Sequence, residues 1–490
     1  MKQPNGQNSE QAVWRARLVL GCLVLIALCF HQAPGKVVPD TKLDLTADPG
    51  GFLARSLHLW DPQGAFGQLQ NQAYGYLLPM GPFHWFLDLL TVPDWVTQRL
   101  WWSFVLCVAF LGVWKLCGAF GYGALWARFV VALLYALSPR MLGEVAVTSI
   151  EVWPLAMAPW VLLPLVTARA RSEWWSVGWS AVAFGLVGGV NAVATGATLV
   201  LPALWLITRR LDRSTLKIAA GWLGCVAAVS FWWLVPLVLL GSYSPPFLDW
   251  IEDASVTTAT ASVFESFRGT SQWLNFLSTG GGPSWPAGWL FVTQPTLILQ
   301  SALVALLGLA GLAMGSLKHR GFLALGMATG LLLLTLGHAG AAGSPLAPQL
   351  HSLLDGPLAA LRNTHKFELV VRLPLTLAAA HALTRLTSWV TARGIPRWVV
   401  PALAACLTVS IASPAILAQL PRPEGYTAIP AHWREAAAWL DSQQTSGSVL
   451  VVPAASFADF TWGSTKDEPF QALLKRPMAV RDAVPLGSAG

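Results

Sequence analysis

Apolar runs long enough to cross a membrane recur along the whole chain and constrain its fold more than any other feature. A membrane-spanning helix needs roughly 20 residues, and the runs at 125–138 and 174–190 are short for one. The 490 residues are 54% hydrophobic and 11% charged, whereas soluble proteins carry about 25% charged residues. The sequence therefore predicts an all-α polytopic membrane protein with about eleven transmembrane helices, at 17–33, 97–117, 125–138, 152–168, 174–190, 192–208, 217–240, 289–314, 321–337, 368–385 and 398–417.

Basic residues indicate how these helices are oriented. Arg15 and Arg17 precede the first run, and Lys318 and Arg320 follow the eighth, so that alternating spans bring such clusters to one side. That side is the cytoplasm by the positive-inside rule. We therefore expect a multi-pass plasma-membrane protein with a cytoplasmic N-terminus and long loops on the extracytoplasmic face. The net charge of +7 follows from these short clusters and does not indicate a nucleic-acid partner.

The first long connection, 34–96, carries an unusual density of carboxylates. Asp40, Asp44, Asp48 and Asp61 follow the first apolar run directly, and carboxylates beside a membrane span are costly unless they face water or a partner. Prolines 39 and 49 favour a loop or a short turn over one continuous helix. The alternative is a solvated acidic loop. Later in this connection, 51–60 and 83–90 have helical spacing and are predicted to lie at the membrane surface.

Between those two predicted helices lies a stretch rich in amide and tyrosine side chains. Gln70, Asn71, Tyr74 and Tyr76 offer stacking faces and neutral hydrogen bonds, which suit a sugar ligand. They are also ordinary loop residues.

The chain changes character at about residue 418. The stretch IPAHWREAAAWLDSQ predicts an amphipathic helix with Trp433, Ala437 and Leu440 on one stripe, and GSVLVVPA predicts a buried strand. We therefore divide the chain into a transmembrane domain, 1–417, and the beginning of a soluble α/β or β-rich extracytoplasmic domain, 418–490, which we expect to be truncated.

Several long motifs carry a family resemblance. They are DTKLDLTADPGGFLARSLHLWDPQGAFGQLQNQAYGYLLPMGPF, WVTQRLWW, LRNTHKFELVVRLPL and DEPFQALLKRPMAVRDAVPLGSAG. The chain resembles the N-terminal membrane portion of the mycobacterial α-(1→3)-arabinofuranosyltransferases, the arabinofuranosyltransferase D family, whose members are far longer. The resemblance implies a GT-C-type glycosyltransferase bundle. It also implies a polyprenyl-phosphate donor, decaprenyl-phosphoryl-arabinose, and a cell-wall polysaccharide acceptor, the arabinan of arabinogalactan or lipoarabinomannan.

That chemistry assigns roles to the acids. The family's β-linked donor and α-linked product imply inversion, for which one general base suffices. Asp40 is the predicted base, because GT-C enzymes generally place theirs at the first acid after the first span, and Asp44 is a second acid or an acceptor contact. The alternative for Asp40 is a turn cap. Glu144 and Glu151 are candidate ligands for Mg²⁺ or Mn²⁺, although their spacing does not prove a metal, and two solvated loop acids are the simpler interpretation.

The leaving phosphate requires positive charge. Arg140, Arg362, His365 and Lys366 are the candidates, because basic residues on the outer face run against the usual bias. The alternative is anchoring at lipid headgroups by snorkelling.

Other functions are also compatible with a polytopic protein of this kind. They are a GT-C transferase using another polyprenyl-phosphate sugar such as mannose, a lipid-linked sugar transporter, and a non-catalytic scaffold for cell-wall assembly. A transporter should carry mid-membrane charges and repeated halves, but here the acids cluster at the outer mouth and no internal repeat is visible. The sequence therefore favours an enzyme.

Overall fold

The fold is described from a computed structural model of the chain. The described residues are 4–70, 73–168, 173–209, 212–243, 251–279, 282–453, 455 and 458–480, with side chains from residue 10 onward.

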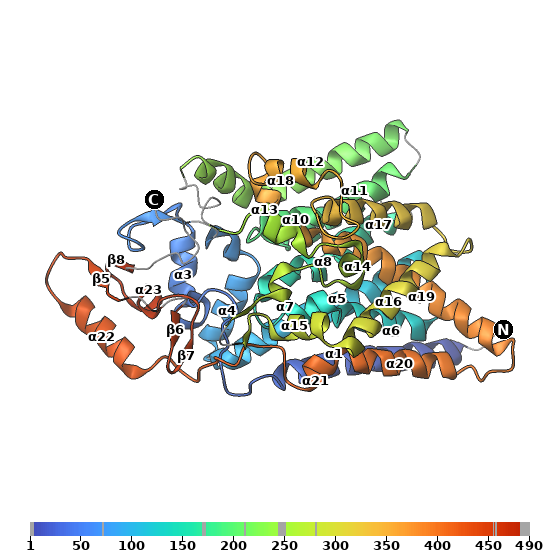
Figure 1. The fold of residues 1–490 in the computed structure, drawn as a ribbon, viewed down its shortest axis with the longest axis horizontal. Helices are drawn as coiled ribbons and strands as arrows, with labels where there is room; N and C mark the ends of the chain where they lie inside the picture. Colours follow the sequence, from blue (N-terminus) through green and yellow to red (C-terminus); the bar gives the residue numbers. More distant parts are fainter. Residues whose placement is uncertain are drawn as a thin grey trace.

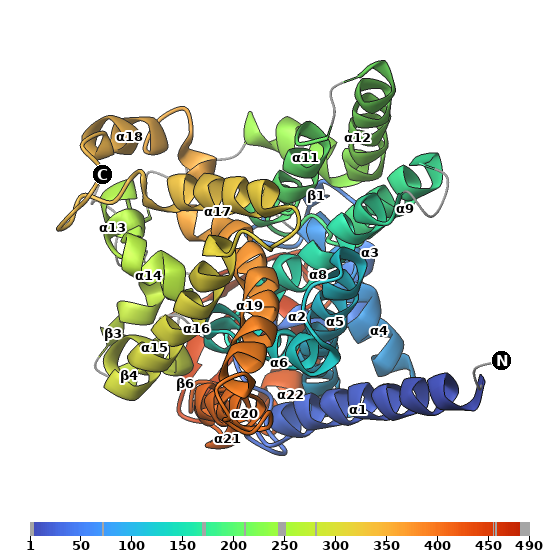
Figure 2. The same ribbon diagram turned by 90° about the vertical axis from the view of Figure 1, so that its right-hand side faces the viewer.

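A helical bundle forms most of the molecule (Figures 1 and 2). Its helices are α1 (Pro4–Phe30), α5 (Asp94–Phe120), α6 (Leu125–Ala136), α7 (Pro139–Glu144), α8 (Ser149–Val166), α9 (Glu173–Gly185), α10 (Ala192–Ala197), α11 (Val200–Ile207), α12 (Arg213–Gly241), α15 (Pro286–Thr293), α16 (Pro295–Ala313), α17 (Arg320–Thr335), α19 (Glu368–Thr391), α20 (Val399–Ile411) and α21 (Ser413–Ile416). The predicted fold class is confirmed.

Within the described residues, 7 helical segments are long and apolar enough to cross a membrane, and three shorter apolar helices, Ala192–Ile207, Arg320–Thr335 and Val399–Ile411, match further predicted spans. The predicted span 289–314 is divided, because Pro295 starts a new helix after Gln294 adopts an extended conformation. The total of about eleven spans stays a prediction.

Helix α19 lies at the centre of the bundle, as the end-on view shows (Figure 2). In its most apolar window 83% of the residues are buried, against 17% for α1 at the periphery. Two glycines allow α16 to pack directly on it. A Cβ on Gly311 would lie 2.1 Å from the carbonyl oxygen of Ala378, and one on Gly308 would lie 2.7 Å from that of Leu375. Small residues permit this close backbone approach between membrane helices.

The remaining elements are short. Those of the first loop are α2 (Asp44–Ala47), α3 (Pro49–Ser56), β1 (Trp60–Asp61), β2 (Gln68–Leu69), η1 (Ala73–Leu77) and α4 (Met80–Leu89). Those of the middle of the chain are α13 (Ala254–Ala259), α14 (Val263–Arg268), η4 (Trp273–Phe276), β3 (Ser278–Thr279), β4 (Gly282–Pro283), α18 (Ala347–Leu354), η5 (Ala359–Leu361) and η6 (Thr364–Phe367). Those of the C-terminal segment are α22 (Ala431–Ser442), β5 (Val449–Val451), β6 (Asp459–Phe460), β7 (Gly463–Ser464), α23 (Pro469–Leu473) and β8 (Met478–Val480).

The first loop folds as short helices separated by turns. Asp48 caps α3 by accepting a 2.9 Å hydrogen bond from the Gly51 amide, and Pro49 occupies the first helical turn. The helices predicted at 51–60 and 83–90 are present as α3 and α4. The last residues of the first stretch differ from the prediction, because Trp60 and Asp61 pair antiparallel with Leu69 and Gln68 instead of extending the helix.

The C-terminal segment packs against this loop at the end of the molecule away from the N-terminus (Figure 1). The amphipathic helix predicted here is α22, with Ala437 buried. The predicted buried strand is β5, which pairs in parallel with β8. It is less buried than predicted, with Leu450 56% exposed, because this sheet has two strands only.

Candidate active site

Asp40 is buried between the first loop and the start of α8. Its Oδ1 accepts a 2.6 Å hydrogen bond from the Ser149 amide, and its Oδ2 accepts bonds from the Ser149 hydroxyl at 2.7 Å and the Trp102 indole at 3.0 Å. Burial raises the pKa of this carboxyl, and the bonds from Ser149 and Trp102 partly offset the rise. A carboxylate offers about four acceptor positions, and these three bonds occupy most of them.

The sequence explains why this carboxylate is held so firmly. Ser149 is the first residue of α8, and the first amides of a helix lack partners within it. A carboxylate is also favoured there by the helix dipole. Asp40 therefore does act as a cap, but it caps α8, 109 residues away in sequence, and not a turn of its own loop.

A lysine from the C-terminal segment completes the surroundings of Asp40. The Lys466 ammonium donates to the backbone carbonyl of Asp40 and, at 2.6 Å, to that of Val147. Its charge lowers the pKa of the Asp40 carboxyl relative to burial alone, while burial lowers the pKa of Lys466 itself. The next residue, Asp467, accepts a 3.0 Å bond from the Leu43 amide, so the segment is anchored on both sides of the base.

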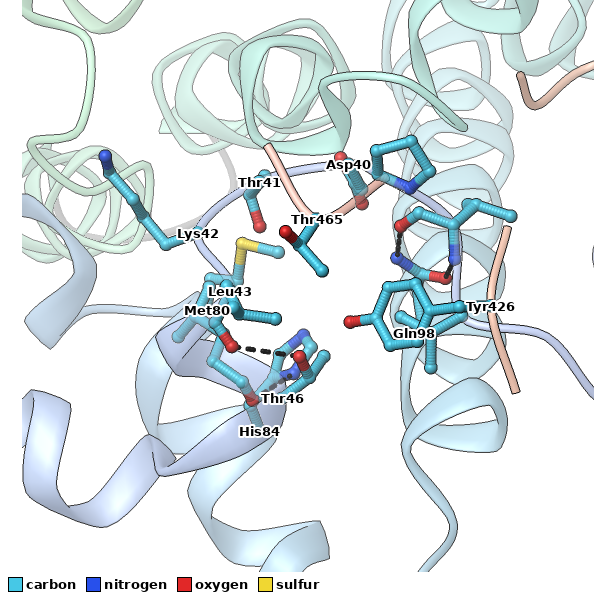
Figure 3. A pocket seen from close by; sticks show the side chains of 14 residues that line it. Asp40, Thr41, Lys42, Leu43, Thr46, Met80, His84, Gln98, Tyr426 and Thr465 are labelled. Atoms are coloured by element: carbon cyan, nitrogen blue, oxygen red, sulfur yellow. Dashed lines mark hydrogen bonds between the residues drawn. The ribbon is translucent and has the colours of Figure 1, made fainter. Parts of the chain in front are cut away.

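A small cavity of about 20 Å³ lies beside Asp40 (Figure 3). Gln98 shapes one side by pairing with both backbone groups of Val38, at 3.1 and 2.9 Å. His84 lies on another side, with Nδ1 3.1 Å from the Leu45 carbonyl oxygen, and burial lowers its pKa to about 4. On these two sides of the cavity, the loop that carries Asp40 is therefore held by neutral groups.

Three of the four predicted phosphate ligands meet on the other side of the same helix start. Arg140 lies 2.5 Å from Glu144 and 3.9 Å from Glu151, and Lys366 lies 3.6 Å from Glu151. Arg140, Glu151, Lys366 and His365 line a second small cavity, of about 10 Å³. The Nδ1 atom of His365 is buried without a hydrogen-bond partner among the described residues. Arg140, His365 and Lys366 are called the cationic cluster below.

Arg362 lies apart from this cluster. It pairs with Asp355 at 3.4 Å and donates to the carbonyl of Glu252, on the side of α13 and α18. The structure therefore brings Lys366 to Glu151 but holds Arg362, four residues earlier, elsewhere.

The predicted sugar-binding residues are divided. Gln70 lines a larger cavity, of about 330 Å³, together with Asp44. Tyr74 and Tyr76 are buried, and Tyr76 packs edge-on against Phe52 with ring centroids 5.7 Å apart. Asn71 lies outside the described residues. Asp44 itself pairs with Arg55 at 2.7 Å, and burial raises its pKa.

The family can now be assigned from comparisons with known proteins. A family model described as "Alpha-(1->3)-arabinofuranosyltransferase, N-terminal GT-C domain" matches residues 24–490. This chain belongs to the α-(1→3)-arabinofuranosyltransferase GT-C family. The resemblance inferred from the sequence motifs is thereby confirmed.

Curated relatives and solved structures of the family agree with this assignment. The α-(1→3)-arabinofuranosyltransferase of Mycolicibacterium smegmatis is 44% identical over 476 residues, which cover 94% of this chain and 33% of that protein. The one from Mycobacterium tuberculosis is 41% identical over 483 residues, covering 94% and 34%. The cryo-EM structure of arabinofuranosyltransferase AftD from mycobacteria matches with a TM-score of 0.79 at 37% identity, covering 96% of this chain and 32% of that one. The chain spans about a third of the length of these relatives.

The two acids predicted to hold a metal are paired with cationic side chains in the structure. Glu144 and Glu151 both face Arg140, and Lys366 also faces Glu151. Within the described residues, no group of three or more His, Cys, Asp or Glu side chains could hold a metal ion. The divalent cation stays a prediction, and no chemistry below depends on it.

Sequence reasoning missed the side chains that hold the base. Trp102 lies within a predicted apolar span, Ser149 lies in the connection before the span 152–168, and Lys466 lies 426 residues from Asp40. The sequence signal for Lys466 is its position immediately before the family motif DEPFQALLKRP.

Proposed function

We propose that this chain is the membrane catalytic part of an arabinofuranosyltransferase. It transfers arabinofuranose from decaprenyl-phosphoryl-arabinose to cell-wall arabinan, forms α-(1→3) branches and inverts the anomeric carbon. The family assignment supports the activity, and a cluster of cations at the same helix start as Asp40 supports the donor class.

One observation carries the proposal: Asp40 and the cationic cluster both contact residues of the first turn of α8. Ser149 binds the Asp40 carboxylate, and Glu151, two residues later, faces Arg140 and Lys366. The reaction requires both groups close together, because the attacking hydroxyl loses a proton as the phosphate leaves on the opposite side of the sugar.

The step is a single displacement. The acceptor hydroxyl oxygen forms a bond to the anomeric carbon, its proton passes to the Asp40 carboxylate, and the bond from that carbon to the donor phosphate breaks. The electron pair leaves with decaprenyl phosphate. Burial suits Asp40 to this role, because a raised pKa makes the carboxylate a stronger base than an exposed aspartate.

In this scheme the donor phosphate takes the place of Glu151 beside the cationic cluster. Glu151 lies 3.6 Å from Lys366 and 3.9 Å from Arg140, accepts a 3.2 Å hydrogen bond from Asn191 and is 20% exposed, whereas Glu144 is fully buried against Arg140. A donor phosphate in place of Glu151 would form charge-assisted hydrogen bonds at 2.7–2.9 Å. Arg140, His365 and Lys366 are therefore the proposed donor phosphate ligands.

Lys466 is a positioning residue in this scheme. Its ammonium binds the backbone carbonyl of Asp40 and that of Val147, in the turn before α8. One side chain therefore fixes the first loop relative to the start of α8. The site then lies at the extracytoplasmic face, with the N-terminus of α1 in the cytoplasm, in keeping with the distribution of basic residues.

A transfer assay with the full-length protein in membranes tests the proposal. Lipid-linked arabinose and lipid-linked mannose are supplied in parallel with an arabinan acceptor, and the product linkage is determined by NMR. We expect transfer of arabinose with α-(1→3) linkage. Transfer of mannose instead, or movement of the intact lipid-linked sugar across the bilayer without transfer, would contradict it.

A further inference from the structure

The larger cavity, of about 330 Å³, lies between the first loop and the C-terminal segment. Its size falls at the lower end of the range of about 300–1,000 Å³ found for ligand pockets. The first loop contributes Asp44, Arg55, Gln68 and Gln70, and the C-terminal segment contributes Gln471 and Arg476.

The two walls of this cavity are joined directly. The Met478 amide donates to the Gln63 carbonyl at 2.8 Å, and the Phe66 amide donates to the Met478 carbonyl at 3.2 Å. The Gln63 side chain donates to the Lys475 carbonyl at 2.5 Å. These bonds connect parts of the chain about 400 residues apart, so the cavity is a built feature of the fold.

The lining indicates a neutral polar ligand. Arg55 is paired with Asp44 at 2.7 Å, and Arg476 lies 3.8 Å from Asp441 and donates to the Gln443 carbonyl at 2.9 Å. The charges therefore compensate each other, which disfavours a strongly charged ligand. The glutamine amides add donors and acceptors without net charge, the chemistry that recognises sugar hydroxyls.

The cavity also lies next to the base. Lys42 lines both this cavity and the one beside Asp40, and Asp44 follows Asp40 by four residues. We infer that this cavity binds the arabinofuranose chain of the acceptor, on the side that leads to Asp40. This inference rests on the proposed function, and it assigns the C-terminal segment a part in substrate binding.

Variants of Gln471 test the inference, because this exposed side chain can be replaced with little risk to folding. Full-length protein in detergent is titrated with a synthetic arabinofuranose tetrasaccharide, with binding followed by saturation-transfer NMR and kinetics by transfer from lipid-linked arabinose. Gln471→Ala should raise the acceptor KM about fivefold, the effect of one net hydrogen bond. Gln471→Trp should fill the cavity and abolish tetrasaccharide binding, and both variants should leave the donor KM unchanged.

Lys475→Ala is the matched control, because its exposed side chain lies on the same segment outside the cavity lining. If Gln471→Trp keeps the wild-type acceptor KM and tetrasaccharide binding, the inference is overturned. The proposed function would still stand in that case, because arabinose transfer continues. Tetrasaccharide binding that depends on Gln471 in a protein without transfer activity would instead reject the proposed function and leave the binding site in place.

Discussion

Replacing Lys466 with methionine removes the ammonium that joins the C-terminal segment to the base while keeping a flexible side chain of similar length. Two charged hydrogen bonds are lost, to the carbonyls of Asp40 and Val147. The segment itself remains attached, because Asp467 still accepts from the Leu43 amide and Tyr426 still pairs with Val37. We therefore expect a folded protein with a misplaced base.

The magnitude follows from the bonds removed. A hydrogen bond to a charged group contributes about 1.5–3 kcal/mol. If about 2 kcal/mol of this positioning is needed in the transition state, kcat falls about 30-fold. The donor KM should change little, because Lys466 is absent from the cavity lined by the cationic cluster.

The pH profile separates positioning from a merely structural role. The Lys466 ammonium lowers the pKa of Asp40, so its removal raises that pKa further. Since the base must be deprotonated, the acidic limb of kcat against pH moves to higher pH in Lys466→Met. Arabinose transfer is measured from lipid-linked donor in membranes across this range, with Lys475→Met as the control on the same segment.

A wild-type rate and an unshifted acidic limb in Lys466→Met would refute this reasoning. A lower rate with an unshifted limb would show that Lys466 supports the fold but does not act on Asp40.

Three further predictions follow from the same structure. In the wild type, kcat/KM should fall on acidification with an apparent pKa above that of an exposed aspartate, because burial raises the pKa of Asp40; a limb at or below the usual aspartate range would contradict this. Lys366→Met should raise the donor KM about tenfold, the loss of one charge-assisted bond of at least 1.4 kcal/mol, and an unchanged donor KM would remove it from the phosphate site. Gly311→Ala should lower the thermal midpoint in detergent, because the new Cβ meets the Ala378 carbonyl and the overpacking costs about 1–3 kcal/mol of stability. Gly224→Ala, with open space at its Cβ, should leave the midpoint unchanged.

Hydropathy was sufficient to predict the class of this protein and much of its helix placement. The spans at α5, α8 and α12 lie where the apolar runs are, because a bilayer-crossing helix must satisfy its backbone internally and expose apolar side chains. Asp40 is selected by the family resemblance, as the first acid after the first span, and its role as the base stays a prediction.

Contacts between distant parts of the chain could not be predicted in this way. Lys466 lies in the C-terminal segment, 426 residues from Asp40 in sequence, and only the folded chain brings the two into contact. Arg362 and Lys366 stand in the same motif, but the η5 and η6 turns direct them to different partners, Asp355 and Glu151. Sequence spacing does not reveal such turns.

The most direct test of the central claim is arabinose transfer by Asp40→Asn, which keeps the size of the side chain but removes the basic carboxylate. Asp48→Asn is the control, because asparagine caps α3 as well as aspartate does. With protein levels matched, we expect Asp40→Asn to lower transfer by about 10²–10⁴-fold, the usual contribution of a general base, and Asp48→Asn to leave it unchanged. Transfer by Asp40→Asn at the wild-type rate would contradict it.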